Sequence, residues 1–503
     1  MSAPHNNDEI EDAPEMLDVD DALEEIEDAE GDIAMDSDGE PEEIEEIILQ
    51  NDSIAYFDLH KDSVFAIAQH PTQPSLIATG GSEGEGEDAP GKGYVFDTSS
   101  ISGRPVLPPS YNSDPSAPQQ KSTELTPLFE IDGHTDSINA LAFTYPRGQY
   151  LASAGMDGRL RAYQLSIDAR NKASFTFVGE AQEVPEINWL LPCPSAQYPN
   201  TIALGASDGS VWVYTIDASD SSNPLQIVQS YFMHPESCTA GAWSADGTFL
   251  ATVGEDSSLN VWDVWGEAAA KGLANENGQT VVSLTAADQR FEVEGGLYSV
   301  AIEPKNAFVA VGGAGGVVKI VALPRIGNPT SSQAHPQSSK QSKAKAKGGE
   351  SGGSQGGAIL ASLQSQGDGV ESLAFSPTQS LLAAGSVDGS IAIYDTSRRF
   401  AVRRHIKEAH DEFSVVKLDF VRGSGDGWLL TSCGMDGVLK RWDVRGATPS
   451  GSINTSSAAG FVKEWRGHRG DGEGGGILGF VQGGSGERII TAGDDGIVLV
   501  FET

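Results

Sequence analysis

The sequence predicts an all-β fold, an eight-bladed β-propeller that is closed by pairing of its N- and C-terminal strands. Three observations predict it. A unit of short apolar strands recurs along residues 51–503, most copies contain an Asp-Gly turn, and the last copy is one strand short. Asp-Gly between two β-like runs is a strong signal for a two-residue hairpin. Most units start roughly 45–75 residues apart, which fits four-stranded blades with insertions in the longer gaps.

The clearest unit runs from His134 to Tyr163. It contains a histidine, an apolar strand, a strand of small residues, the turn Asp157-Gly158 and a strand that ends in an aromatic residue. Further units that begin with a histidine are those of His60, His234, His410 and His468. Two units have the Asp-Gly turn without the histidine, at residues 207–209 and 387–389, and one unit around residues 314–316 has neither, which makes eight in total.

The closing strand is predicted from the two ends of the repeat region. The last unit ends at Thr503, directly after its third strand, which would leave an unpaired strand edge. Residues 53–58 form a β-like run just before the first unit and belong to no unit. We therefore expect this run to supply the fourth strand of the last blade.

The charge of the chain divides it into two parts. The net charge of −40 comes from 72 acidic and 32 basic residues, and residues 1–50 hold 21 of the acids and no Lys or Arg, so residues 51–503 carry −19. We expect residues 1–50 to be a disordered acidic arm and residues 51–503 to be the propeller. Within it, about residues 327–357, rich in Ser, Gly and Lys, are predicted to be a disordered insertion, and the Pro/Ser-rich residues 99–127 a linker.

Composition also excludes several classes of function. Strong acidity disfavours direct binding of nucleic acid and favours basic partners. No run approaches the roughly 20 apolar residues of a membrane-spanning helix, so we expect no membrane association. Cys193, Cys238 and Cys433 lack metal-ligand spacing, and we expect no metal, no cofactor and no catalytic site. The acidic N-terminus is unlike a secretory or transit sequence, which predicts a cytoplasmic protein; the lysines of residues 340–347 leave nuclear import as an alternative.

Two units end in Trp-Asp, at residues 262–263 and 442–443. With the recurring histidine and Asp-Gly turn, this ending resembles the WD-repeat family over about residues 53–503. His, Ser or Thr, and Asp recur together and imitate a catalytic triad, but a catalytic set would occur once. The resemblance implies that they form, with the terminal Trp, a structural hydrogen-bond network. Its predicted members are His134, Ser153, Asp157, His234, Thr252, Asp256, Trp262, His410, Ser432, Asp436 and Trp442.

In WD-repeat propellers the loop between the histidine and the first strand opens onto one face, the top, around the central channel. Acidic residues occur in or beside this loop in seven of the eight units, and others precede the motif aspartate of a turn. A ring of carboxylates would concentrate negative potential over the channel and suit Arg and Lys side chains. The predicted partner-binding acids are Asp62, Asp136, Glu183, Glu186, Glu236, Glu255, Asp368, Glu371, Asp411, Glu412 and Asp494, with Asp471 and Glu473 in the eighth unit. Apolar contact nearby is expected from Phe65, Tyr298 and Phe413. The alternative is an acidic surface that is merely solvated.

Residues 52–67, 205–212 and 490–502, together with the acidic arm, resemble one family more closely. They are similar to the angio-associated migratory cell protein family, whose fungal members are dedicated chaperones of a large-subunit ribosomal protein, L-ten or uL-sixteen. The resemblance implies that the acidic top face holds the basic N-terminal segment of this client until the pre-60S subunit receives it. Asp136, Glu186 and Glu371 fall where the client-binding acids of the family would lie. The alternative function is a generic WD-repeat scaffold for signalling or cell-migration complexes, and in either case we expect a monomer.

Overall fold

The computed structural model describes residues 51–503 except 85, 87–88, 102–121, 169–171, 327–355, 424–426, 447–459 and 471–474. The compact unit to which they belong spans Leu49–Thr503. The predicted acidic arm, almost all of the predicted insertion at 327–357, and the acids Asp471 and Glu473 lie outside the described residues.

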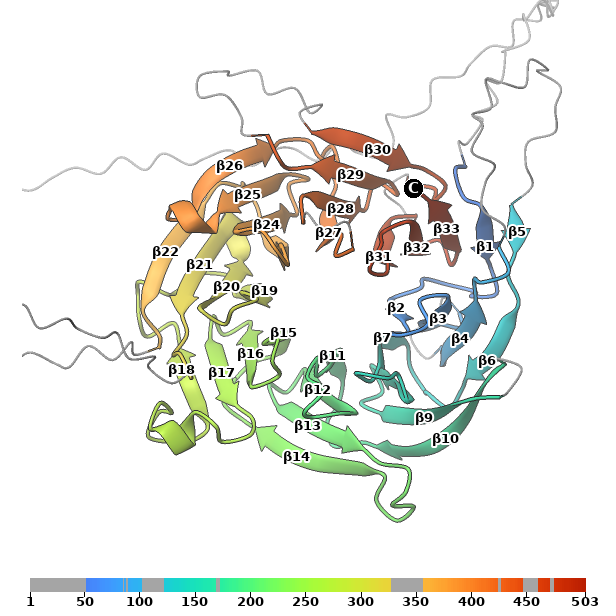
Figure 1. Ribbon diagram of the computed structural model, residues 1–503, viewed down its shortest axis with the longest axis horizontal. Helices are drawn as coiled ribbons and strands as arrows, with labels where there is room; N and C mark the ends of the chain where they lie inside the picture. Colours follow the sequence, from blue (N-terminus) through green and yellow to red (C-terminus); the bar gives the residue numbers. More distant parts are fainter. Residues whose placement is uncertain are drawn as a thin grey trace, which may run out of the picture. The chain divides into compact units, whose positions relative to one another are not determined.

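The described strands form eight sheets arranged in a ring (Figure 1). We call the axis that the innermost strands surround the central channel. Each sheet is a blade whose strands follow one another from the channel outwards. Innermost strands of neighbouring blades contact each other around the whole ring, including those of the last and first blades. This confirms the predicted eight-bladed propeller, including the unit around residues 314–316 that has neither the histidine nor the Asp-Gly turn.

The first four blades, each given from the innermost strand outwards, have the following bounds. Blade 1 is β2 (Ala66–Gln69), β3 (Leu76–Ser82), β4 (Gly91–Asp97) and β6 (Pro127–Ile131). Blade 2 is β7 (Ile138–Phe143), β8 (Tyr150–Gly155), β9 (Leu160–Ile167) and β10 (Ala173–Ala181). Blade 3 is β11 (Ile187–Pro192), β12 (Thr201–Ala206), β13 (Val211–Ile216) and β14 (Leu225–Tyr231). Blade 4 is β15 (Cys238–Trp243), β16 (Phe249–Gly254), β17 (Leu259–Asp263) and β18 (Thr280–Leu284).

The remaining blades have the same order. Blade 5 is β19 (Leu297–Ile302), β20 (Phe308–Gly313), β21 (Val317–Ala322) and β22 (Ile359–Gln364). Blade 6 is β23 (Val370–Phe375), β24 (Leu381–Ser386), β25 (Ile391–Asp395) and β26 (Ala401–Ile406). Blade 7 is β27 (Val415–Phe420), β28 (Leu429–Gly434), β29 (Leu439–Asp443) and β30 (Phe461–Trp465). Blade 8 is β31 (Ile477–Val481), β32 (Arg488–Gly493), β33 (Val498–Glu502), β1 (Ala55–Phe57) and β5 (Thr123–Glu124). Short 3-10 helices are η3 (Ala269–Lys271), η4 (Ala314–Gly316) and η5 (Thr396–Arg398).

Blade 8 is completed by the strand that precedes blade 1, as the sequence predicts. Strand β1 pairs antiparallel with β33, with Ala55 opposite Val500 and Phe57 opposite Val498. The predicted linker at residues 99–127 is partly wrong, because β5 and the start of β6 lie in it. Strand β5 adds to β1 in parallel and makes blade 8 five-stranded. The amide of Thr123 donates to the carbonyl of Ile54 over 3.0 Å, so this addition covers the outer edge of the closing strand.

The Asp-Gly turns are hairpins between the second and third strands of their blades. Gly158 has φ 71° and Gly209 has φ 80°, values in the left-handed region that favours glycine. A side chain at Gly209 would also lie 2.2 Å from the carbonyl oxygen of His234 in the next blade. The glycine therefore serves both the turn and the close approach of neighbouring blades.

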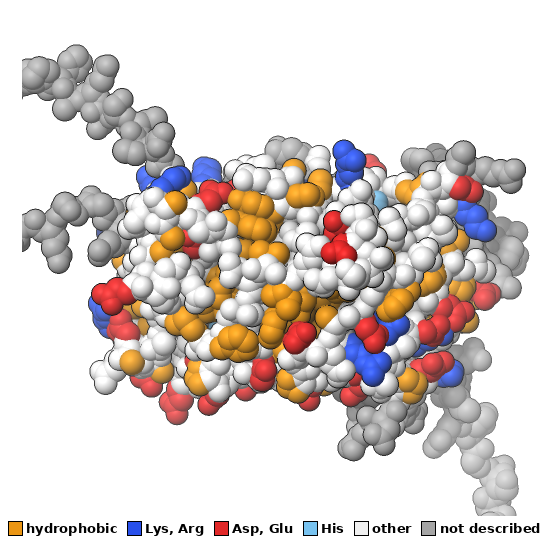
Figure 2. All heavy atoms as spheres, turned by 90° about the horizontal axis from the view of Figure 1, so that it is seen from below, with side chains coloured by type: hydrophobic (Ala, Val, Ile, Leu, Met, Phe, Trp, Pro, Cys, Tyr) orange, Lys and Arg blue, Asp and Glu red, His pale blue; other side chains and the backbone are white. Residues whose placement is uncertain are grey.

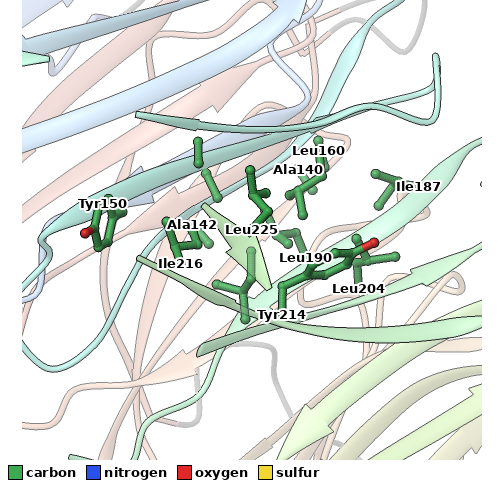
Figure 3. Packing of buried hydrophobic residues seen from close by; sticks show 14 of the residues in the cluster. Ala140, Ala142, Tyr150, Leu160, Ile187, Leu190, Leu204, Tyr214, Ile216 and Leu225 are labelled. Carbon is green, nitrogen blue, oxygen red and sulfur yellow. The ribbon is translucent and has the colours of Figure 1, made fainter. Parts of the chain in front are cut away.

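The core lies between the blades. Second strands are buried along their whole length, as in β8, β12, β16 and β24, because both faces of these central strands contact other blades. Figure 3 shows one such contact, where Tyr150 and Leu160 of blade 2 lie with Leu204 and Ile216 of blade 3 in one apolar cluster. The continuous burial of the second strands is thus explained by packing of sheet on sheet.

Phe57 tests how far ring closure contributes to stability. Its side chain is fully buried and stacks on Phe96 of blade 1 at 4.9 Å between ring centroids, while its strand pairs with blade 8. We expect Phe57→Ala to lower the free energy of unfolding by about 3–5 kcal/mol, measured by urea denaturation. The control is Phe232→Ala, whose side chain is 68% exposed. Equal losses in both variants would contradict this account of closure.

Candidate functional site

The recurring His, Ser or Thr, and Asp residues lie together inside blades 2, 4, 7 and 8. In blade 7, Nε2 of His410 lies 2.7 Å from Oγ of Ser432, and Nδ1 lies 2.9 Å from Asp436. Nε1 of Trp442 donates to the same Ser432 oxygen over 2.9 Å. The hydroxyl is therefore bonded on two sides and buried within the sheet. This arrangement joins the strands of one blade and leaves no activated, accessible nucleophile.

Other blades repeat the arrangement with small differences. His134 bonds Ser153 over 2.8 Å and Asp157 over 3.1 Å. In blade 4, Thr252 accepts from Trp262 and lies 2.8 Å from Nε2 of His234, but Nδ1 of His234 meets Ser258, which itself donates to Asp256. In blade 8, His468 contacts Thr491 and Asp495 at 2.8 and 3.0 Å. This fourth set was not predicted from the sequence, although Thr491 and Asp495 have the same four-residue spacing as Ser432 and Asp436.

Hydrogen bonds hold Asp157, Asp256 and Asp436 of the network in their charged form. Burial raises the pKa of Asp436, but the hydrogen bond from His410 and the electrostatic attraction between the two groups lower it by more. The pKa of Asp436 therefore lies below its usual value. For Asp157, burial is likewise outweighed, by bonds from His134 and from the Arg159 amide. These carboxylates are buried and committed to the fold, so they do not belong to the exposed acidic surface.

The histidine position is filled differently in three blades. Glu183 and Gln366 lie four residues before the innermost strand, as His134 and His234 do. Gln366 is buried and donates to Ser390. Glu183 is exposed, and its charge is near enough to Tyr214 to raise the pKa of that hydroxyl further after burial has raised it. Glu183 therefore occupies the network position of blade 3 at the edge of the acidic face.

His60 is a network histidine without an aspartate. Its Nε2 lies 2.9 Å from Oγ1 of Thr79, while its buried Nδ1 has no hydrogen-bond partner among the described residues. Burial lowers the pKa of His60 to about 3. The ring is therefore neutral in the folded protein at any physiological pH.

This pKa predicts acid sensitivity of blade 1. Between the ordinary value of 6.5 and about 3, the unfolded chain binds a proton that the folded chain excludes. Stability from this residue is complete above pH 6.5 and falls by up to about 1.4 kcal/mol per pH unit below it. We expect His60→Gln, which copies Gln366 of blade 6, to lose about 2 kcal/mol less than the wild type between pH 7 and pH 5, measured by urea unfolding. Parallel losses in the two proteins would refute the assignment.

The innermost strands carry one extra residue each at the channel mouth. In seven blades the pairing with the second strand skips one residue, a β-bulge, directly after the first buried residue of the strand. The bulge residues are Asn139, Asn188, Thr239, Tyr298, Glu371, Val416 and Leu478. Phe65 lies five residues after His60, the spacing that separates Asn139 from His134, and takes the same position in blade 1. Bulges re-aim a side chain, and here they create a ring of eight positions at the mouth.

Three bulge residues show where this ring lies. Asn139 donates to the carbonyl of Ile187 in the next blade, Asn188 to that of Cys238 over 3.0 Å, and Thr239 to that of Leu297 over 2.6 Å. Each acceptor is the first residue of the neighbouring innermost strand. The bulge side chains thus lie along the channel wall, between adjacent innermost strands.

The predicted acids surround this ring. Asp62, Asp136 and Asp368 share one position, two residues before the first buried residue of the inner strand. Each accepts a hydrogen bond from the next amide, at 2.7, 2.6 and 2.7 Å. Glu186 and Glu236 are exposed in the corresponding loops of blades 3 and 4. One carboxylate oxygen of each aspartate therefore fixes the loop while the group stays at the surface.

The hairpins bring Glu255 and Asp494 beside these loops. The amide of Glu255 donates to the carbonyl of Ser237, and that of Asp494 to the carbonyl of Gly476. Asp494 also accepts from Oγ of Ser63 over 2.5 Å, which links the mouth of blade 8 to that of blade 1. Hairpin acids and loop acids therefore lie on the same face of the ring.

The acids of blades 6 and 7 differ from the sequence-based expectation in their setting. Glu371 is a bulge residue of β23 rather than a loop residue, so it lies on the channel wall. Partial burial there raises the pKa of Glu371, and the charge of Asp368 raises it further. Asp411 and Glu412 are exposed, and Asp411 has φ 51°, because the chain turns sharply between His410 and Phe413.

Some residues of the mouth were missed by the sequence analysis. Met156, 44% exposed, precedes the motif aspartate of blade 2 at the position that Glu255 and Asp494 fill in their blades. Asn139, Asn188 and Thr239 were missed because a bulge adds one residue without changing the apolar pattern. The predicted apolar neighbours are present, with Phe65 42% and Tyr298 39% exposed and Phe413 half-buried.

The charge distribution follows from these positions. Figure 2 shows Asp and Glu side chains along much of the lower edge of the ring, with few Lys or Arg among them. Within the described ranges no three His, Cys, Asp or Glu residues are grouped so that they could hold a metal ion. The part of the chain that the structure describes also contains no helix long and apolar enough to span a bilayer. The surface is suited to attract cationic side chains.

Ring, network and acidic mouth define the class of the protein as a WD-repeat β-propeller. A model of the WD domain, G-beta repeat matches residues 125–164, 225–263 and 357–395. The crystal structure of Chaetomium thermophilum Sqt1 is 58% identical, covers 90% of this chain and 98% of its own, and superposes with a TM-score of 0.77. The chain belongs to the Sqt1 family. A second structure of that protein, bound to the N-terminus of the ribosomal protein L10, is also 58% identical, with a TM-score of 0.76 and 90% and 100% coverage.

More distant relatives agree with this assignment. Ribosome assembly protein SQT1 of Saccharomyces cerevisiae is 26% identical over 484 residues, 92% of this chain and 89% of that protein. Human angio-associated migratory cell protein is 24% identical over 456 residues, 90% of this chain and 80% of that protein. The predicted resemblance to the angio-associated migratory cell protein family is thereby confirmed.

Proposed function

We propose that this protein is a ribosome-assembly chaperone that binds the basic N-terminal segment of newly made ribosomal protein L10 on its acidic top face. One observation carries the proposal: the Chaetomium relative, 58% identical across nearly the whole propeller, is bound to the N-terminus of L10. The acids around the channel mouth supply the chemistry that such a segment requires. Arg pairs with carboxylates through two parallel hydrogen bonds, and Lys pairs with them as a point charge.

The arrangement of the acids supports capture rather than catalysis. Asp136, Glu186, Glu236, Asp368, Glu371 and Glu412 come from five different blades. A client that pairs with several of them is held by many weak contacts, each of which competing phosphates or ribosomal neighbours can replace. Neutralising the client in this way would keep it from binding RNA wrongly or aggregating before the pre-60S subunit receives it.

The proposal includes no catalytic role. The His, Ser or Thr, and Asp sets are committed to hydrogen bonds inside the blades, as in Ser432 between His410 and Trp442. We propose a non-enzymatic, monomeric protein that meets its client in the cytoplasm, where ribosomal proteins are made.

Charge reversal at the mouth tests the proposal. We expect Glu186→Lys with Glu371→Lys to weaken binding of a synthetic L10 N-terminal peptide by at least about tenfold, because two attractive carboxylates become repulsive. Affinity is measured by calorimetry, and raising salt from about 50 to about 200 mM should weaken wild-type binding because exposed charge pairs are screened.

The matched control changes the same charge on the opposite face. Glu276 and Glu487 are exposed in loops at the far ends of the strands, and Glu276→Lys with Glu487→Lys should bind the peptide like the wild type. Thermal unfolding verifies that both double variants fold. If the mouth variant binds as tightly as the control, the acidic-face mechanism is wrong; if the wild type does not bind the peptide, the chaperone function is wrong as well.

A further inference from the structure

The seven bulge positions around the channel mouth, and the position of Phe65 in blade 1, are related by the symmetry of the ring but differ in chemistry. In blades 2, 3 and 4 they hold Asn139, Asn188 and Thr239, which donate to the next blade. We call these three residues the polar arc, and their donor groups are already hydrogen-bonded within the protein. Tyr298 in blade 5 also bonds within the protein, donating its hydroxyl to the carbonyl of Gly295 over 2.6 Å.

The opposite side of the ring is apolar at the same positions. Blades 7, 8 and 1 hold Val416, Leu478 and Phe65, which we call the apolar arc. Val416 packs partly against the cluster of Ile477 and Phe480. Leu478 is half-buried and Phe65 is 42% exposed, and neither belongs to a buried cluster of the described residues. Three apolar side chains thus lie in sequence around one side of the mouth, and two of them, Phe65 and Leu478, pack against none of the buried clusters of the described residues.

Acidic groups border this arc. Asp62 lies three residues before Phe65, and Asp494 is tied to the loop of Phe65 through Ser63. Asp411 and Glu412 are exposed in the loop that leads to Val416, and Glu371 fills the bulge of the preceding blade. An apolar patch bordered by carboxylates is complementary to an apolar side chain that has Arg or Lys neighbours in its own chain. It is not complementary to an uncharged apolar segment, which would leave those carboxylates desolvated.

We propose that the apolar arc of Phe65, Leu478 and Val416 is an anchor subsite that takes an apolar side chain of the client's basic segment. This inference rests on the proposed function and deepens it, because it makes the site selective for basic segments that carry an apolar residue between their charges. The acids at the rim steer the segment and set its encounter rate, and the buried apolar contact at the centre fixes its register.

The two kinds of contact respond differently to salt, which separates them experimentally. Pairing of exposed charges is screened by ions, whereas burial of apolar surface is not. Loss of the anchor should therefore weaken binding by the same factor at low and high salt. Loss of a rim acid should weaken it mainly at low salt.

The test is a double-mutant cycle with two peptides. One peptide is the L10 N-terminal segment, and the other has every apolar side chain of that segment changed to serine with its charges kept. The protein variants are Phe65→Ser with Leu478→Ser and, as control, Leu360→Ser, a side chain 51% exposed on outer strand β22. We expect the Phe65→Ser, Leu478→Ser variant to bind the first peptide roughly tenfold more weakly at about 50 and about 300 mM salt. It should bind the serine peptide as the wild type does.

Each outcome decides the proposal. If the Phe65→Ser, Leu478→Ser variant binds the first peptide like the wild type, or binds both peptides more weakly by the same factor, the anchor is overturned while acidic capture stays intact. Wild-type protein that fails to bind the first peptide overturns the proposed function and the anchor together. Unfolding temperatures of the variants within a few degrees of the wild type show that the comparison reports binding and not folding.

Discussion

The pairing of β1 with β33 is the interaction on which the rest of the structure depends. Each blade buries its central strands against its neighbours, so blades 8 and 1 are complete only when the ring is closed. Closure depends on three residue pairs: Ala55 with Val500, Tyr56 with Leu499 and Phe57 with Val498. Packing of Phe57 against Phe96 then extends the joint into blade 1. The addition of β5 covers the outer edge of this short strand and gives blade 8 five strands, whereas each of the other described sheets has four.

The closed ring converts a repeated sequence into a surface. Loops and hairpins that are far apart in the chain become equivalent positions at one mouth, and each blade contributes its own side chains there. The hydrogen-bond network supplies the rigidity that this requires, because His410, Ser432 and Trp442 fix the strands that hold Asp411 and Glu412. A client that pairs with several carboxylates gains from such rigidity, since less order has to be imposed on binding.

Much of the fold could be predicted from the sequence because the repeat is marked by residues with strong local preferences. Asp157-Gly158 favours one type of turn. The β-like run before blade 1 belonged to no unit, and the last unit lacked a fourth strand, so the two could be matched. Strand β5 and the first residue of β6 were assigned to a linker because Pro and Ser dominate the segment and because the pairing of β5 depends on a partner distant in sequence. The acids of the mouth could be found by spacing from the histidine. The setting of Glu371 could not, since a bulge changes the direction of one side chain without leaving a pattern of apolar residues.

The joint between the first and last blades also has a consequence for the order of events during synthesis. The closing strand emerges from the ribosome before its partner β33, which follows more than 400 residues later. Contacts of such long separation form late in folding, because loop closure costs entropy before the contact is gained. Phe65 and Asp62 stand on one side of this joint and Leu478 and Asp494 on the other, so the mouth is divided until closure. Incomplete chains would therefore present neither the joined rim nor the apolar arc, and competence to receive a client would arise only with the finished protein.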